Sequence, residues 1–170
     1  MRRKNGRYYL SRVLKRGTKI NTTSLMEALL NAPPKTVGKF RWTITDTFDG
    51  RDHETPFVFG HLSKSSDDGH VTIVDPSAKA QMEAIAPNLL KASAPFVFLP
   101  EFSGLAYLHV WNGISEELFE KRLKTLIEEA HSNFFAECDV EPISDYTRFG
   151  KKLEDLDKFI GRVLKLVSEG

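Results

Sequence analysis

The residues best suited to chemistry in this chain are its lysines and arginines, because they are concentrated at one end. The first 45 residues hold eleven Lys and Arg and one acid, Glu27, a net charge of +10 in a chain whose total is +1, so the remainder carries −9. Cations in such a segment attract phosphates, and the aromatic rings of Tyr8, Tyr9 and Trp42 among them could stack on bases. The charge split predicts a nucleic-acid-binding surface. Its predicted contacts are Arg2, Arg3, Lys4, Arg7, Arg12, Lys15, Arg16, Lys19, Lys39 and Arg41.

The same basic segment also fits three roles that involve no nucleic acid. Lysine and arginine protect the exposed edges of sheets, so the segment could be a solvated edge strand. It could also pair with the acidic remainder of the same molecule, or attach to an anionic membrane surface. A nucleic-acid surface requires that Arg7, Arg12, Lys15, Arg16 and Lys39 share one exposed face.

The other reactive residue types show no spacing typical of a catalytic or metal site. The five histidines form no HExxH pair, and none has zinc-finger spacing with Cys138, the single cysteine. Most carboxylates cluster around predicted turns, which aspartate favours for its own backbone hydrogen bonds. There is no glycine-rich phosphate loop. We therefore expect no catalytic residue, metal, cofactor or small-molecule substrate, and keep a small metal-dependent nuclease as an alternative.

Length and composition indicate one globular domain. The chain has 170 residues, 41% hydrophobic and 11% aromatic, which is enough for a sizeable core. The basic start at residues 1–4 is not followed by the apolar stretch of a signal peptide, and no apolar run is long enough to span a membrane. One cysteine cannot form an internal disulfide. These features predict a cytoplasmic protein.

Hydrophobic periodicity predicts an α+β fold, with a mixed or mainly antiparallel sheet and helices packed on one face. Expected strands cover residues 7–15, 39–48, 55–64, 70–74, 96–99, 105–111 and 136–143. Expected helices cover residues 24–30, 76–86 and 116–130, and Asp67-Asp68-Gly69 is an expected turn. The run at 96–99 is apolar on both faces, so its strand should be central. Residues 1–150 form the predicted domain. Residues 151–170 are an appended element, expected to contribute a final strand at 161–167 or, alternatively, one longer helix.

Several short segments together suggest a family. They are Lys4-Asn5-Gly6 with Tyr8, Ile20-Asn21 before residues 24–30, Asp49-Gly50 with residues 57–59, residues 94–99 with Gly104-Leu105-Ala106, and Phe159-Ile160-Gly161-Arg162. In this order and spacing they resemble the N-terminal region of the RexA-type phage-exclusion proteins of temperate phages. The resemblance implies a cytoplasmic DNA-binding component of an abortive-infection system, a homodimer, and a small membrane-protein partner. This chain is much shorter than the family's usual chain.

The sequence therefore predicts a non-enzymatic, largely sequence-independent nucleic-acid-binding protein, with DNA favoured over RNA. One alternative is a protein-interaction or inhibitor module whose basic face meets an acidic partner. The other is the metal-dependent nuclease.

Overall fold

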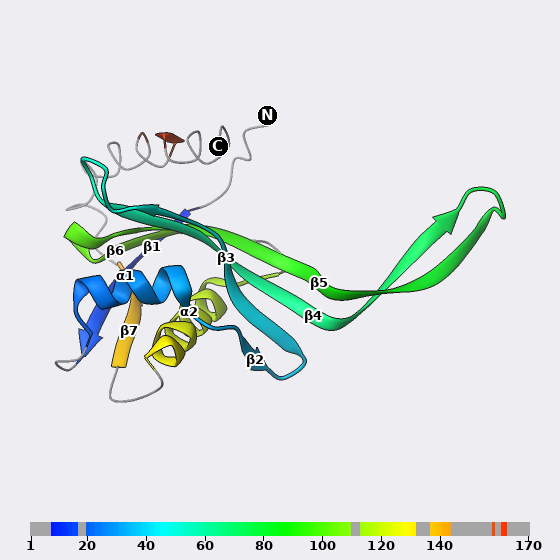
Figure 1. The fold of residues 1–170 in the computed structure, drawn as a ribbon, viewed down its shortest axis with the longest axis horizontal. Coiled ribbons are helices and arrows are strands. Elements are labelled where there is room, and N and C mark those ends of the chain that lie inside the picture. Colours follow the sequence, from blue (N-terminus) through cyan, green and yellow to red (C-terminus); the bar gives the residue numbers. More distant parts are fainter. Residues whose placement is uncertain are drawn as a thin grey trace.

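Residues 8–143, where the structure describes them, form one curled antiparallel sheet accompanied by the two α-helices α1 and α2 (Figure 1). The computed structural model describes residues 8–16, 20–109, 113–131, 137–143, 158 and 161–162. Within these ranges the sheet has seven strands in the order β2-β3-β4-β5-β6-β1-β7, and neighbouring strands run antiparallel. The predicted α+β class and antiparallel sheet are confirmed. No described helix is long and apolar enough to cross a membrane.

The order of the described elements follows the sequence prediction for residues 8–31 and 96–143 and departs from it between them. The elements are β1 (Tyr8–Arg16), α1 (Thr22–Asn31), β2 (Lys35–Val37), β3 (Phe40–Gly50), β4 (Phe57–Asp75), β5 (Ala80–Leu99), a 3₁₀ turn (Pro100–Phe102), β6 (Gly104–Leu108), α2 (Glu116–Ala130) and β7 (Glu137–Pro142). Of residues 151–170, the structure describes Lys158, Gly161 and Arg162, which are helical; the rest of the predicted C-terminal element lies outside the described residues.

Local capping explains where the two long helices begin. Ser115 caps α2, and its hydroxyl accepts a hydrogen bond from the Leu118 backbone N–H at 3.2 Å. The cap of α1 is Asn21. The Asn21 side chain accepts from the Ser24 N–H at 2.8 Å, and the Ser24 hydroxyl accepts from the Asn21 N–H at 3.0 Å. This reciprocal capping box satisfies two backbone donors.

The predicted helix at residues 76–86 is wrong, because most of that segment belongs to strand β5. The predicted turn at residues 67–69 is also wrong and lies inside β4. The two strands pair from Val58↔Phe98 to Asp75↔Ala80, with one register shift after Lys64. Glycine occupies position 69 because β4 and β5 approach each other closely there: a Cβ at this position would lie 2.3 Å from the Leu89 Cβ. Long-range pairing with β4 therefore overrides the local helical pattern of residues 80–86.

The β4–β5 hairpin extends beyond the rest of the sheet as a two-stranded arm, which we define as residues 67–88. Strand β3 pairs with β4 only as far as Ser66, and β6 pairs with β5 only from Phe96 onward. Figure 1 shows the arm projecting far from the body of the molecule. Pro87 lies in the arm, where the free edge of β5 tolerates a residue without a backbone N–H.

The core consists of two apolar clusters on alternating residues of the strands. Residues 58 and 62 of β4 and residues 94, 96 and 98 of β5 join the buried side chains of α1 and α2 in the larger cluster. Residues 57 and 59 of β4 and residues 97 and 99 of β5 form the smaller one. Since successive residues of a strand point to opposite faces, the sheet is apolar on both faces here. The expected central position of residues 96–99 is confirmed, because β5 lies between β4 and β6.

A half-buried carboxylate ties α2 to the sheet. The fully buried Ser11 hydroxyl of β1 donates to Glu120 Oε1 at 2.6 Å, and the Tyr107 hydroxyl of β6 donates to the same oxygen at 3.1 Å. The Tyr107 ring also stacks on Phe119 with centroids 3.9 Å apart. Burial raises the pKa of Glu120, although the hydrogen bonds from Ser11 and Tyr107 act in the opposite direction.

We predict that Glu120→Gln stabilises the fold at pH 7 and that this gain disappears near pH 4. The pKa of Glu120 is higher in the folded than in the unfolded chain, so its contribution to stability is present below the ordinary value of 4.5 and is lost as the pH rises through the folded pKa. The glutamine oxygen can accept the same hydrogen bonds without the charge. Because Glu120 is partly exposed to solvent, the gain should stay below about 1 kcal/mol.

Urea unfolding at pH 4 and pH 7 measures this difference. Glu117→Gln, on an exposed position of the same helix, is the matched control and should change the free energy of unfolding by less than about 0.5 kcal/mol. A variant at Glu120 that is less stable than the wild type at pH 7 would contradict the prediction.

Candidate nucleic-acid interface

The cations of β1 are divided between two faces of the strand, and two of the three are already engaged. Arg16 forms an ion pair with Asp139 of β7. Lys15 points to the other side, where its ammonium donates to the Thr22 hydroxyl at 2.7 Å. Arg12 is exposed and makes no ion pair with any described residue. Arg12 and Lys15 are therefore the cations of this strand whose charge no described carboxylate compensates, and they point to opposite faces.

Asp139 is held as a carboxylate by two cations. Lys124 of α2 donates to Asp139 Oδ1 at 3.2 Å, and Arg16 lies on its other oxygen. These contacts, Lys124 first, lower the pKa of Asp139. Arg16 thus contributes to fastening β1, β7 and α2 together, and its charge is neutralised there.

Arg41 and Lys39 lie in a different part of the sheet from β1. Strands β4, β5 and β6 separate β3 from β1 in the strand order. The Arg41 guanidinium lies at the base of the arm, 3.3 Å from the Asp67 carboxylate and 3.4 Å from the Asn88 side-chain oxygen. Lys39 is exposed in the turn between β2 and β3.

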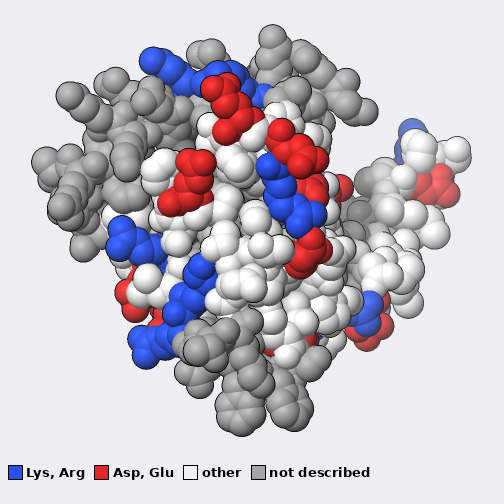
Figure 2. Space-filling view, turned by 60° about the vertical axis from the view of Figure 1, so that its left-hand side comes forward, with Lys and Arg blue, Asp and Glu red and all other residues white. Residues whose placement is uncertain are grey.

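The described cations of the N-terminal segment consequently do not share one face. On the surface shown in Figure 2, basic and acidic residues are interspersed. The other predicted contacts lie outside the described residues: Arg2, Arg3, Lys4, Arg7 and Lys19.

A second group of cations gathers around two aromatic rings at the β2–β3 end of the sheet. The register places Lys35, Trp42 and Lys64 side by side across β2, β3 and β4. The Lys64 ammonium lies 4.1 Å from the centre of the Phe40 ring and 5.7 Å from that of Trp42. We call this group the basic–aromatic cluster: Lys35, Lys39, Phe40, Trp42, Lys64 and Arg122.

The remaining members reach the same rings from the β2–β3 turn and from α2. The Lys39 ammonium is 5.5 Å from the Phe40 centroid, and the Arg122 guanidinium is 5.6 Å from that of Trp42. Trp42 is only 2% exposed, so it cannot stack on a base as the sequence suggested. Instead it holds Lys64 and Arg122 in place through cation–π contact.

Little negative charge opposes the basic–aromatic cluster. Lys35 forms an ion pair with Glu129, 3.0 Å apart, and both side chains are partly exposed. Lys39, Lys64 and Arg122 form no ion pair with any residue that the structure describes. The Arg122 Nε is buried without a hydrogen-bond partner in that part of the chain. Aromatic rings orient these cations without neutralising them, so they stay available to an anion.

Lys64 and Arg122 were not among the residues predicted from the sequence. The alternating residues of β3 and β4 gave a clue to Lys64. In an antiparallel pair, directly opposite residues share a face, so a register that sets Lys64 opposite Trp42 puts both side chains on the same face of the sheet. No sequence pattern pointed to Arg122, because the packing of α2 brings it to Trp42.

The histidines and the cysteine offer little chemistry by comparison. His61 Nδ1 lies 4.0 Å from the Asp46 carboxylate, and burial lowers the pKa of His61. Cys138 is fully buried, and burial raises its pKa to about 12, which disfavours a nucleophilic thiolate. Within the described ranges, no three His, Cys, Asp or Glu residues gather as a metal ion would need.

In the described part of the chain, uncompensated cations thus gather at the basic–aromatic cluster. No protein-family model, curated protein or solved structure matches this chain. The resemblance to the RexA-type proteins therefore stays a prediction from the sequence, and function is inferred from the geometry of the described residues.

Proposed function

We propose that this chain is a non-enzymatic nucleic-acid-binding protein that contacts phosphates through the basic–aromatic cluster. The observation that supports this most is the convergence of Lys39, Lys64 and Arg122 on two rings with no carboxylate partner among the described residues. Phosphate contacts carry no base information, so binding is largely independent of sequence. In this proposal Arg12, in a different part of the sheet, and the basic residues that precede β1 in the sequence supply further phosphate contacts.

The arrangement of the cluster suits a polyanion better than scattered lysines would. A free lysine loses conformational entropy when it is fixed on a ligand, and the rings already restrict Lys64 and Arg122. The Lys35–Glu129 pair is solvent-accessible, so exchanging the carboxylate for a phosphate costs little. Cations contributed by β2, the β2–β3 turn, β4 and α2 also span more surface than one strand provides.

The biological setting follows from the family resemblance. The resemblance to the RexA-type proteins implies DNA rather than RNA as the ligand. It also implies a cytoplasmic location and a role in phage exclusion together with a small membrane-protein partner. We carry these over to this chain as part of the proposal.

We predict that Lys39→Gln with Lys64→Gln weakens binding to duplex DNA and flattens its salt dependence. Each lost phosphate contact should reduce the slope of log K against log salt by roughly 0.9, so the pair should reduce it by about 2. The loss should be similar for DNA of any sequence. Fluorescence anisotropy with duplex, single-stranded and RNA oligomers at several ionic strengths measures both effects and ranks the three ligands.

A matched control removes the same charge elsewhere. Lys79→Gln with Lys121→Gln changes two exposed lysines, one at the tip of the arm and one on α2. The control should keep the wild-type slope. Equal losses in both double variants would mean that net charge, not the cluster, governs binding, and absence of binding at low salt would reject the proposed function.

We further predict that Arg12→Gln and Arg16→Gln behave differently, although both cations lie on β1. Arg12 has no ion-pair partner among the described residues, so its loss should reduce the salt slope by about 1. Arg16 is neutralised by Asp139, so its loss should leave the slope nearly unchanged and lower stability by at most about 1 kcal/mol. The same anisotropy titrations measure the salt slope, and thermal melts measure the stability. A larger change of slope for Arg16→Gln than for Arg12→Gln would mean that Arg16, not Arg12, contacts phosphate.

A further inference from the structure

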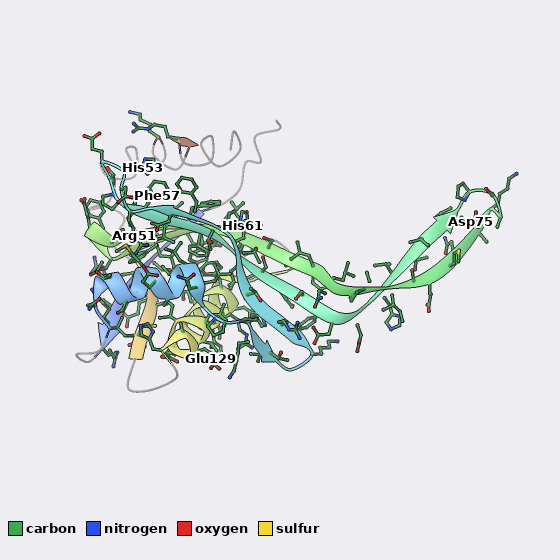
Figure 3. All side chains as sticks on the ribbon, viewed as in Figure 1. Arg51, His53, Phe57, His61, Asp75 and Glu129 are labelled. Carbon is green, nitrogen blue, oxygen red and sulfur yellow. The ribbon has the colours of Figure 1, made fainter. Side chains whose placement is uncertain are left out.

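The arm has two strand edges with no neighbour among the described strands. Strand β3 accompanies β4 as far as Ser66, and β6 accompanies β5 only from Phe96 onward. Figure 3 shows Asp75 at the far tip of the arm, remote from the residues labelled on the body. The unpaired backbone N–H and C=O groups of such edges form a template on which a further strand can pair. The two edges differ in how well they are protected against this.

The edge of β5 has several features that oppose pairing. Pro87 and Pro95 supply no backbone N–H, and Lys91 lies within the register shift of the β4–β5 pair. Asn88 has a left-handed backbone with a φ of 56°. Prolines, lysines and irregular backbone on an edge all hinder the addition of a strand. The edge of β5 is therefore poorly suited to a partner.

The edge of β4 has none of these features over residues 67–75. This segment contains no proline and no lysine, and residues 71–74 are all β-branched, which favours extended backbone. Ile73 is 45% exposed and Val74 is 67% exposed, and the two side chains point to opposite faces of the strand. A partner lying on one face would cover only one of them. A strand added beside β4 would contact both, so the edge suits a strand better than a flat surface.

The charge of the arm defines the chemistry of the added strand. The acids of the arm are Asp67, Asp68, Asp75 and Glu83, and its one cation is Lys79, a net charge of −3. Asp68 and Asp75, near the two ends of the β4 edge, form no ion pair with any described residue. An acidic edge repels phosphates. It also disfavours a second copy of itself, because full antiparallel pairing of two such edges sets Asp67 opposite Asp75 twice.

We infer that the β4 edge of the arm accepts an extended basic segment of a different protein, which adds as a third antiparallel strand. Main-chain hydrogen bonds hold the segment, and its branched side chains pack beside residues 71–74 on both faces. Its cations lie near Asp68 and Asp75. A two-stranded hairpin is marginally stable in water, so a third strand also stabilises the arm. The segment loses conformational entropy on binding, which limits its dissociation constant to roughly 1–100 µM.

Fluorescence anisotropy without nucleic acid tests this site independently of the proposed DNA binding. The probe is a synthetic peptide of alternating valine and threonine with lysines at both ends, about as long as residues 67–75. The wild type should bind it with a dissociation constant below about 100 µM. The same peptide with its central backbone nitrogens methylated has lost the donors that face β4 and should bind at least about 10-fold more weakly.

A charge exchange tests the role of the two aspartates. Asp68→Lys with Asp75→Asn should weaken binding of the lysine peptide at least about 10-fold and should favour a peptide with glutamates in place of the lysines. Asparagine at position 75 can still accept the hydrogen bonds that the Asp75 carboxylate accepts from the Ser77 and Ala78 N–H groups, at 2.9 and 3.1 Å. The turn at the tip is thereby kept.

The matched control, Gln81→Lys with Glu83→Lys, changes the net charge of the arm by the same amount on β5. Both side chains are exposed, and this variant should shift the dissociation constant of the lysine peptide by less than about 3-fold. A loss as large as that of the Asp68 and Asp75 variant would mean that net charge, not the β4 edge, governs binding, and would overturn the inference.

Hydrogen exchange followed by NMR locates the contact on the wild type and so does not depend on any variant folding. Saturating peptide should slow the exchange of amides within residues 67–75 and leave the outer edge of residues 80–88 unchanged. Protection of the β5 edge, equal binding of the lysine and glutamate peptides, or no binding at about 1 mM peptide would overturn the inference. Protection of residues 67–75 that appears with rising protein concentration alone would also overturn it, because a second copy would then occupy the edge.

Discussion

The pairing of β4 with β5 is the constraint on which the rest of the molecule depends. These strands of 19 and 20 residues pair along nearly their whole length, but their other neighbours, β3 and β6, accompany them only through the body. Near the core the pair has apolar residues on both faces and forms the centre of the sheet. Beyond Ser66 none of the other described strands lies beside it, and it leaves the body as the arm. The register shift after Lys64 marks this change, and the contacts of Arg41 with Asp67 and Asn88 brace the exit.

Helix α2 links the stability of the body to the proposed site. Its Glu120 is hydrogen-bonded to β1 and β6, while Arg122, two residues later, lies over Trp42 of β3. Partial burial disfavours the charged form of this carboxylate, yet its hydrogen bonds fix the helix against the sheet at the position that brings Arg122 to the ring. The geometry of the basic–aromatic cluster therefore depends on packing that none of its own residues provides.

Part of the charge asymmetry of the sequence is resolved by ion pairs among the described residues. Three cations of the basic segment pair with acids of the acidic remainder: Arg16 with Asp139, Lys35 with Glu129 and Arg41 with Asp67. These are the intramolecular contacts that were one alternative to a nucleic-acid surface. Lys39, Lys64 and Arg122 of the basic–aromatic cluster differ from these, because aromatic rings orient them and leave their charge intact. The count of cations in a segment was thus a poor guide to which of them face a partner.

Features set by neighbouring residues could be determined from the sequence alone. The limits of α2, its Ser115 cap, the α+β class and the central position of residues 96–99 all follow from capping and periodicity, which act over a few residues. Residues 80–86 could not be assigned in this way, because alanine, methionine and glutamate favour helices while their alternation also fits a strand, and only pairing with residues 69–75 decided between them. The candidate site was equally beyond the sequence. Lys64 and Arg122 are far apart in the chain, and only the register of β3 with β4 and the packing of α2 bring them to the same ring.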